Sequence, residues 1–293
     1  MSTPLTFTHL RFEVAARTSL RLGQHQAGER LRDALAQVML RAVCPETRRA
    51  PKPSPEHAVT CPACWLLAAD TDPGTVRRAY SLVGPLPPLD VLAPGASFTF
   101  TLTLFGEGFR FLPYFVLAVP AMGETGIGPG RGQFDLVSIQ AIHSLKSERR
   151  SVLAPGENVV RVEQLLTGWE DAINFAQAWA GGTDLSIQFL SPTRLVVSDG
   201  LVKAPDFGVF FQRMLERIDE LARQYNRSER RALEDIQALK DLANQVRLVE
   251  QDTRWVDLWG PSNRTGKRTP MGGFVGQAVY RSYQWDTLLP WLL

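Results

Sequence analysis

The stretch Phe98-Thr-Phe-Thr-Leu-Thr-Leu-Phe105 alternates apolar side chains with threonine, which is the pattern of a strand that buries one face. Upstream, residues 10–14 alternate in the same way and predict a second strand. Apolar residues at spacings of three and four predict amphipathic helices over residues 31–42 and 109–119. The β-branched segment 134–145 predicts one more strand.

With a less distinct strand or hairpin between residues 58 and 84, the first half has the order β-α-β-β-α-β, and the expected class is α+β. This is the order of a ferredoxin-like domain, which we assign to residues 1–146 with a cysteine-containing insertion. Residues 147–158 are charged, contain Pro155-Gly156 and are expected to form a linker. The second domain, residues 158–293, begins a new cycle of strand and helix.

The composition is that of an ordinary globular chain. Its 293 residues are 44% hydrophobic and 21% charged, which excludes a disordered or collagen-like chain. The formal net charge is only +2, so a local patch must bind any anionic partner. The sequence shows no leader pattern and no apolar run of about 18 residues, so we expect a cytoplasmic protein with no membrane partner. Three cysteines are too few for a disulfide framework.

One segment, Pro261–Gln284, has four cations and no acid. The cations are Arg264, Lys267, Arg268 and Arg281. The aromatic residues of the segment are Phe274, Tyr280 and Tyr283. Cations interleaved with aromatic rings suit the phosphates and bases of a nucleic acid. The alternative is a solvated loop whose aromatic residues belong to the core.

A glycine-dense loop runs from Gly123 to Gly132 and carries Arg131. It lacks the Gly-Lys-Ser/Thr of a nucleotidase phosphate loop, and it does not join a strand to a following helix as a dinucleotide fingerprint does. Its glycines allow positive φ angles and a close approach to another group. A tight structural turn is the alternative.

Cys44, His57, Cys61 and Cys64 form a candidate metal site. The two-residue spacing of Cys61-Pro-Ala-Cys64 lets two thiolates bind one tetrahedral zinc, and Cys44 and His57 could complete the set. The alternative is three buried thiols and a surface histidine.

Of the four histidines, His25 is the candidate general base, because it lies in a polar, glycine-flanked loop at the start of a helix. Arg21 precedes it by four residues. His9 and His143 fall in predicted strands and are expected to be structural. A plain surface histidine is the alternative for His25.

The chain resembles the CRISPR precursor-RNA processing endoribonucleases of the repeat-associated RAMP superfamily. The motifs that carry the resemblance are Phe111-Leu-Pro-Tyr-Phe115, the glycine-dense segment ending in Phe134, Ile187-Gln-Phe-Leu-Ser-Pro-Thr-Arg-Leu195, Trp255 leading to Ser262-Asn-Arg264, and Met271-Gly-Gly-Phe-Val-Gly276. They occur in the family's order over almost the whole chain.

The resemblance implies two tandem ferredoxin-like (RRM-like) domains and metal-independent cleavage of CRISPR repeat RNA. The 2′-hydroxyl attacks its own phosphate, which leaves a 2′,3′-cyclic phosphate and a 5′-hydroxyl. His25 would be the base and Lys267 or Arg268 the phosphate partner. Arg21, Arg131, Arg264 and Arg281 would complete the RNA-binding set. No cofactor is expected for catalysis, and zinc would be structural only.

The resemblance also leaves an alternative open, a non-catalytic RNA-binding subunit of a CRISPR effector complex. Family members run on past the Gly-Gly-Phe-Val-Gly motif, whereas this sequence stops at Leu293. We therefore expect a second domain truncated at its end. The apolar tail over residues 285–292 would then be exposed and could meet another effector-complex subunit.

Overall fold

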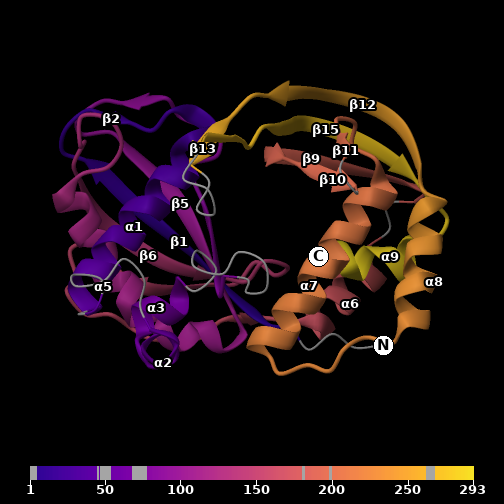
Figure 1. Cartoon of the computed structure of the whole chain (residues 1–293), viewed down its shortest axis with the longest axis horizontal. Coiled ribbons are helices and arrows are strands. Elements are labelled where there is room, and N and C mark those ends of the chain that lie inside the picture. The colour runs from indigo at the N-terminus through magenta and orange to yellow at the C-terminus, as the bar shows by residue number, and fades with distance from the viewer. Residues whose placement is uncertain are drawn as a thin grey trace. The chain divides into compact units, whose positions relative to one another are not determined.

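The computed structural model describes residues 5–44, 46, 54–67, 78–179, 182–197, 200–261 and 268–293. The chain divides into two compact units (Figure 1). The N-terminal unit comprises Thr6–Thr167, and the C-terminal unit comprises Gly168–Leu293 together with Leu5. Both units combine helices with antiparallel sheets.

The N-terminal unit is built on an antiparallel sheet with the strand order β3-β5-β1-β6-β7. Its strands are β1 (Phe7–Ala16), β3 (Tyr80–Val83), β5 (Ser97–Phe105), β6 (Phe134–Ile142) and β7 (Arg149–Leu153), and β8 (Leu166–Thr167) pairs with β1. Helices α1 (Ala27–Val43) and α5 (Leu112–Thr125) pack on one face of this sheet (Figure 1). Strands β1, β3, β5 and β6 and these two helices follow the predicted β-α-β-β-α-β order.

The alternation that predicts β1 and β5 also sets their register. Every second residue of β1 is buried, and Phe12 lies opposite Phe100 with ring centroids 5.0 Å apart. Each fully buried Phe or Leu stabilises the fold by roughly 1.5–3 kcal/mol through its removal from water. A one-residue slip would turn this face to solvent, so the register is fixed by burial.

The predicted linker at 147–158 is wrong over Arg149–Leu153, which form β7 and pair with β6. Strand β7 lies at the edge of the sheet and buries only Val152. An edge strand with charged outward residues has the composition of a linker, and this explains the error.

Between α1 and β3 lie two short helices, α2 (Pro55–Thr60) and α3 (Pro62–Leu66). The strand expected between residues 58 and 84 is β3, at the far end of that range. Further small elements are β2 (Leu20–Arg21), which pairs with β4 (Val91–Leu92), and the 3-10 turns η1 (Gln24–Gln26) and η3 (Gly106–Phe111).

The C-terminal unit has a three-stranded antiparallel sheet of order β12-β15-β9. Its strands are β9 (Asp184–Thr193), β12 (Arg247–Val256) and β15 (Gly273–Arg281), and its small hairpins are β10–β11 (Leu195–Val197, Gly200–Val202) and β13–β14 (Trp259–Pro261, Arg268–Pro270). Its helices are α6 (Trp169–Ala178), α7 (Phe207–Tyr225), α8 (Leu233–Asn244) and α9 (Trp285–Leu292). Asp206 is the N-cap residue of α7. The apolar face of this helix packs with Phe274 and Tyr280 in the core.

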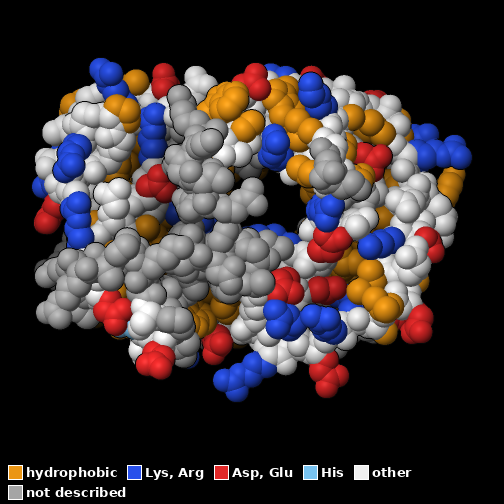
Figure 2. All heavy atoms as spheres, in the orientation of Figure 1, with side chains coloured by type: hydrophobic (Ala, Val, Ile, Leu, Met, Phe, Trp, Pro, Cys, Tyr) orange, Lys and Arg blue, Asp and Glu red, His pale blue; other side chains and the backbone are white. Residues whose placement is uncertain are grey.

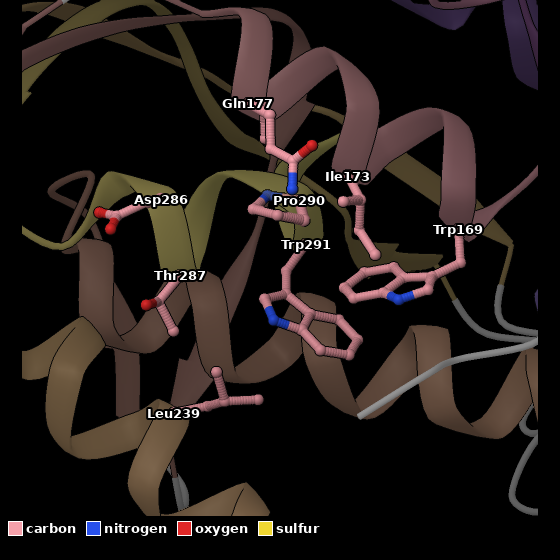
Figure 3. A pocket seen from close by; sticks show the side chains of 9 residues that line it. Trp169, Ile173, Gln177, Leu239, Asp286, Thr287, Pro290 and Trp291 are labelled. Carbon is pink, nitrogen blue, oxygen red and sulfur yellow. The ribbon is translucent and has the colours of Figure 1, made fainter.

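The apolar tail that we expected to be exposed is helix α9, and its Trp285 and Trp291 are buried. Trp291 lies against Trp169 of α6, with ring centroids 4.1 Å apart, at the pocket drawn in Figure 3. The guanidinium of Arg231 covers the Trp291 ring at 4.1 Å. The expectation failed because the apolar partner face on α6 was not recognised in the sequence.

None of the described helices is long and apolar enough to cross a membrane.

Candidate functional site

His25 lies in η1, directly ahead of α1, on a turn that the backbone holds tightly. The amides of Leu22 and Gly23 donate to the Asp90 carbonyl at 2.7 and 3.1 Å, and that of Gln24 donates to Leu89 at 2.9 Å. Gly23 and Gln24 have φ angles of 70° and 53°, so the chain turns left-handed before the helix begins. The imidazole is half-buried at this turn.

Position 23 favours glycine because its φ angle of 70° is left-handed, and the Arg30 side chain lies against it. A Cβ atom there would lie 2.7 Å from the Arg30 guanidinium. That guanidinium donates to the Arg21 carbonyl at 2.6 Å and to the Gln26 side-chain oxygen at 2.7 Å. The charge of Arg30 is thereby held beside the turn of His25 by neutral acceptors. Arg30 was not among the predicted site residues, although its position one turn after Gln26 was a usable signal.

The glycine-dense loop packs on this same region. A Cβ atom at Gly128 would lie 2.5 Å from the Arg21 carbonyl oxygen and 3.6 Å from Cδ of Arg30. Positive φ angles at Gly128, Gly130 and Arg131 shape the turn, which the Arg131 amide closes onto Gly128 at 3.1 Å. The structure therefore brings the loop of Arg131 to the strand of Arg21 and to the start of α1, and both arginine side chains are exposed.

The other three histidines are engaged elsewhere. His9 bonds the Thr103 hydroxyl at 2.9 Å, and burial, followed by the charge of Arg11, lowers its pKa. His143 is buried and its Nδ1 accepts from the Leu145 amide at 3.2 Å. His57 lies among the cysteines. None of these three histidines lies at the turn before α1, where His25 is placed.

Tyr280, one of the aromatic residues of the basic segment, is a core residue. Its hydroxyl donates to the Pro205 carbonyl at 2.7 Å, and burial, followed by the charge of Asp206, raises its pKa. Phe274 is also buried, whereas Tyr283 is exposed. Two of the three aromatic residues in the basic segment therefore belong to the core, as the alternative interpretation of the sequence proposed.

The cations of that segment differ in how far the structure describes them. Arg264 and Lys267 lie outside the described residues, and only the backbone of Arg268 is described, in β14. Arg281 ends β15 and donates through two nitrogens to both carboxylate oxygens of Asp184 on β9, at 2.6 and 2.7 Å. This contact lowers the pKa of Asp184. The sequence count of four cations and no acid missed Asp184, because it comes from a neighbouring strand.

On the face drawn in Figure 2, basic and acidic side chains are interspersed. This agrees with the net charge of +2. Any anionic partner must therefore be bound by a local patch.

The predicted metal ligands come together at the C-terminal end of α1. The ligand atoms of Cys44, His57, Cys61 and Cys64 all lie within 4.8 Å of one another, and the three cysteines are buried and form no disulfide. Burial, followed by hydrogen bonds with Cys44 and Cys61, raises the pKa of the Cys64 thiol. The cluster is a possible metal-binding group.

Two families match the chain. The AF_1859_N family, described as an N-terminal domain, matches residues 5–165, and the CRISPR-associated endoribonuclease Cas6 family matches residues 187–293. A search of curated proteins returned no match.

Solved structures share the fold at low sequence identity. A partial Cas6-RT-Cas1–Cas2 complex matches at 13% identity with a TM-score of 0.61, over 99% of this chain and 42% of that chain. A Cas6 product complex matches at 14% identity and a TM-score of 0.55, over 97% and 89% of the two chains. A Thermus thermophilus Cas6 matches at 14% identity and a TM-score of 0.53, over 98% and 88%.

Proposed function

Since the chain belongs to the RAMP family of CRISPR-processing proteins, with an AF_1859_N domain followed by a Cas6 domain, we propose that it binds CRISPR repeat RNA and cleaves it. The reaction is attack of a 2′-hydroxyl on the adjacent phosphorus. The bond from phosphorus to the 5′-oxygen breaks, and the products carry a 2′,3′-cyclic phosphate and a 5′-hydroxyl. The family that matches residues 187–293 is described as an endoribonuclease, which supports RNA as the substrate class.

The position of His25 carries this proposal. His25 accepts the proton of the attacking 2′-hydroxyl, and this proton is returned to the departing 5′-oxygen. An imidazole suits both transfers because its ordinary pKa is about 6.5. The tight turn before α1 fixes the backbone that carries it, and Arg30 lies beside that turn. A fixed cation near the pentavalent phosphorus stabilises the charge that develops there.

The remaining cations bind the RNA backbone. Arg21 and Arg131 are exposed beside the His25 turn, and the glycine-dense loop holds their two segments together. In the C-terminal unit we propose Arg264, Lys267, Arg268 and Arg281 as phosphate contacts, with Lys267 as the phosphate partner in catalysis. The charge of Arg281 is partly engaged by Asp184, so its contribution is the weakest of the set.

The cleavage itself needs no metal ion under this proposal. Among the residues that the structure describes, the group of side chains placed to hold a metal is the cysteine–histidine cluster. Thiolate and imidazole donors favour zinc over the magnesium that carboxylates bind, so this cluster is suited to a structural metal.

We also propose that each unit is a ferredoxin-like domain. The order β3-β5-β1-β6 supports this for the N-terminal unit, and β12-β15-β9 supplies the matching three strands in the C-terminal unit. The similar Cas6-RT-Cas1–Cas2 assembly supports other CRISPR proteins as partners of this chain.

The test is cleavage of the cognate repeat RNA in EDTA, with an RNA carrying a 2′-deoxy nucleotide at the mapped cleavage site as the matched control. We expect cleavage of the all-RNA substrate and none of the control, while both bind equally. Cleavage that stops in EDTA and returns with magnesium would overturn the mechanism. Tight binding of intact RNA without any cleavage would favour the non-catalytic subunit.

A further inference from the structure

We infer that Cys44, His57, Cys61 and Cys64 bind one Zn²⁺ ion in a tetrahedral site. The function proposed above does not use these residues, and the inference stands without it. The four side chains come from three elements, the end of α1, helix α2, and the first turn of α3 with its N-cap.

The spacing of the ligand atoms fits a tetrahedral zinc. With Zn–S bonds of about 2.3 Å and Zn–N bonds of about 2.0 Å, tetrahedral angles place two sulfurs about 3.8 Å apart and a sulfur and a nitrogen about 3.5 Å apart. The Cys44 and Cys64 sulfurs are 3.4 Å apart, and the Cys44 sulfur lies 3.2 Å from Nε2 of His57. All the other distances between the ligand atoms are within 4.8 Å, so small side-chain shifts would complete the site.

The local backbone explains why Cys61 and Cys64 face the same point. Cys61 is the extended N-cap of α3, Pro62 is the first helical residue, and Cys64 lies in the first turn. The amide of Trp65 donates to the Cys61 carbonyl at 2.9 Å and closes this turn. A proline is favourable at the first helical position, so the Cys-Pro-Ala-Cys sequence fixes both sulfurs on one side of the helix start.

A carboxylate lies beside the second ring nitrogen of His57. Nε2 of His57 faces the sulfurs, and its Nδ1 lies 3.5 Å from Oε1 of Glu46. The other Glu46 oxygen accepts the Ser54 amide at 3.1 Å, and the Ser54 hydroxyl caps α2 by accepting the His57 amide at 3.2 Å. A ligating histidine that donates its second N–H to a carboxylate is the usual outer arrangement of zinc sites.

The ion would link α2 and α3 to the C-terminal end of α1. Helix α3 already packs on α1, and Trp65 lies against Phe111 with ring centroids 4.7 Å apart. The guanidinium of Arg110 covers both rings. A zinc bound by residues of all three helices would contribute its binding energy directly to the folding of this segment.

The experiment is elemental analysis of the full chain purified without chelator. We expect about one zinc per chain, and after exchange a Co²⁺ spectrum with thiolate charge-transfer bands and the strong visible bands of a tetrahedral site. Cys61→Ser and Cys64→Ser should each lose the bound metal. Glu46→Gln should lower zinc affinity, measured by chelator competition, by about 10- to 100-fold, while Glu56→Gln on the same segment should leave it unchanged.

Protein that contains no zinc, takes up no Co²⁺ and shows three titratable thiols would overturn the inference. A disulfide between Cys44 and Cys64 in freshly purified protein would overturn it as well. The Co²⁺ spectrum of the unmodified chain decides the matter if the cysteine variants fail to fold. A positive result for zinc together with a failure of RNA cleavage would leave the site standing and reject the catalytic proposal alone.

Discussion

The His25 turn and the β13–β15 segment both carry cations proposed to contact RNA, but they hold these cations differently. At the His25 turn, the Arg30 guanidinium bonds a backbone carbonyl and an amide oxygen, so its full charge remains available to a ligand. At the end of β15, Arg281 forms a two-pronged pair with the Asp184 carboxylate. A count of charges along the sequence therefore undervalues the first region and overvalues the second.

The largest expected effect is the loss of RNA cleavage in the variant His25→Ala, which changes the His25 turn. Cleavage should fall by roughly 10²–10⁴, the usual range for a positioned base, while RNA affinity changes little. Single-turnover rates at saturating RNA measure this. Gln24→Asn is the matched control on the same turn, because Asn tolerates the left-handed backbone there. Wild-type cleavage by His25→Ala would assign the base to another group.

Two glycine variants test whether the loop packing matters. Gly128→Ala and Gly130→Ala both place a side chain at positive φ, which costs about 1–2 kcal/mol. Only at Gly128 would the new Cβ also meet the Arg21 carbonyl, at 2.5 Å, whereas Gly130 faces open space. Denaturant unfolding should show a loss larger by at least about 1 kcal/mol for Gly128→Ala, accompanied by slower cleavage. Equal losses would show that the loop does not organise the site.

The double variant Lys267→Ala, Arg268→Ala tests the second region. RNA binding should weaken roughly tenfold, and the log–log salt slope should decrease by about 0.7 for each lost phosphate contact to a single strand. Affinity measured across a salt series gives both quantities. An unchanged slope would remove these two residues from the RNA-binding set.

The smallest effect concerns the pair that engages Arg281. Asp184→Asn should tighten RNA binding only about twofold at low salt and not at high salt, because exposed ion pairs are weak and screened. Arg281 should also lose its partner when the pH falls below the lowered pKa of Asp184, because the protonated carboxyl no longer forms the ion pair. Asp252→Asn is the matched control, because Asp252 pairs in register with Gln277. Equal effects of the two substitutions would exclude a role for Arg281.

The sequence predicted best those elements whose burial alternates. The strand at β1 and the stripe of α7 carry their own signal, because each buries one face against a core. Strand β7 and helix α9 were misread, since the burial of each depends on a partner element that local patterns do not reveal. The same distinction holds for the candidate site. His25 could be proposed from its own loop sequence, whereas the role of Arg30 and the pairing of Asp184 with Arg281 became visible only in the folded structure.

The proposed mechanism is tested most directly by mass spectrometry of the ends that the unmodified chain produces from repeat RNA. The proposed mechanism predicts a 2′,3′-cyclic phosphate on one fragment and a 5′-hydroxyl on the other, because its nucleophile would be a 2′-hydroxyl deprotonated by His25. A 3′-hydroxyl facing a 5′-phosphate would contradict it, since water would then be the nucleophile.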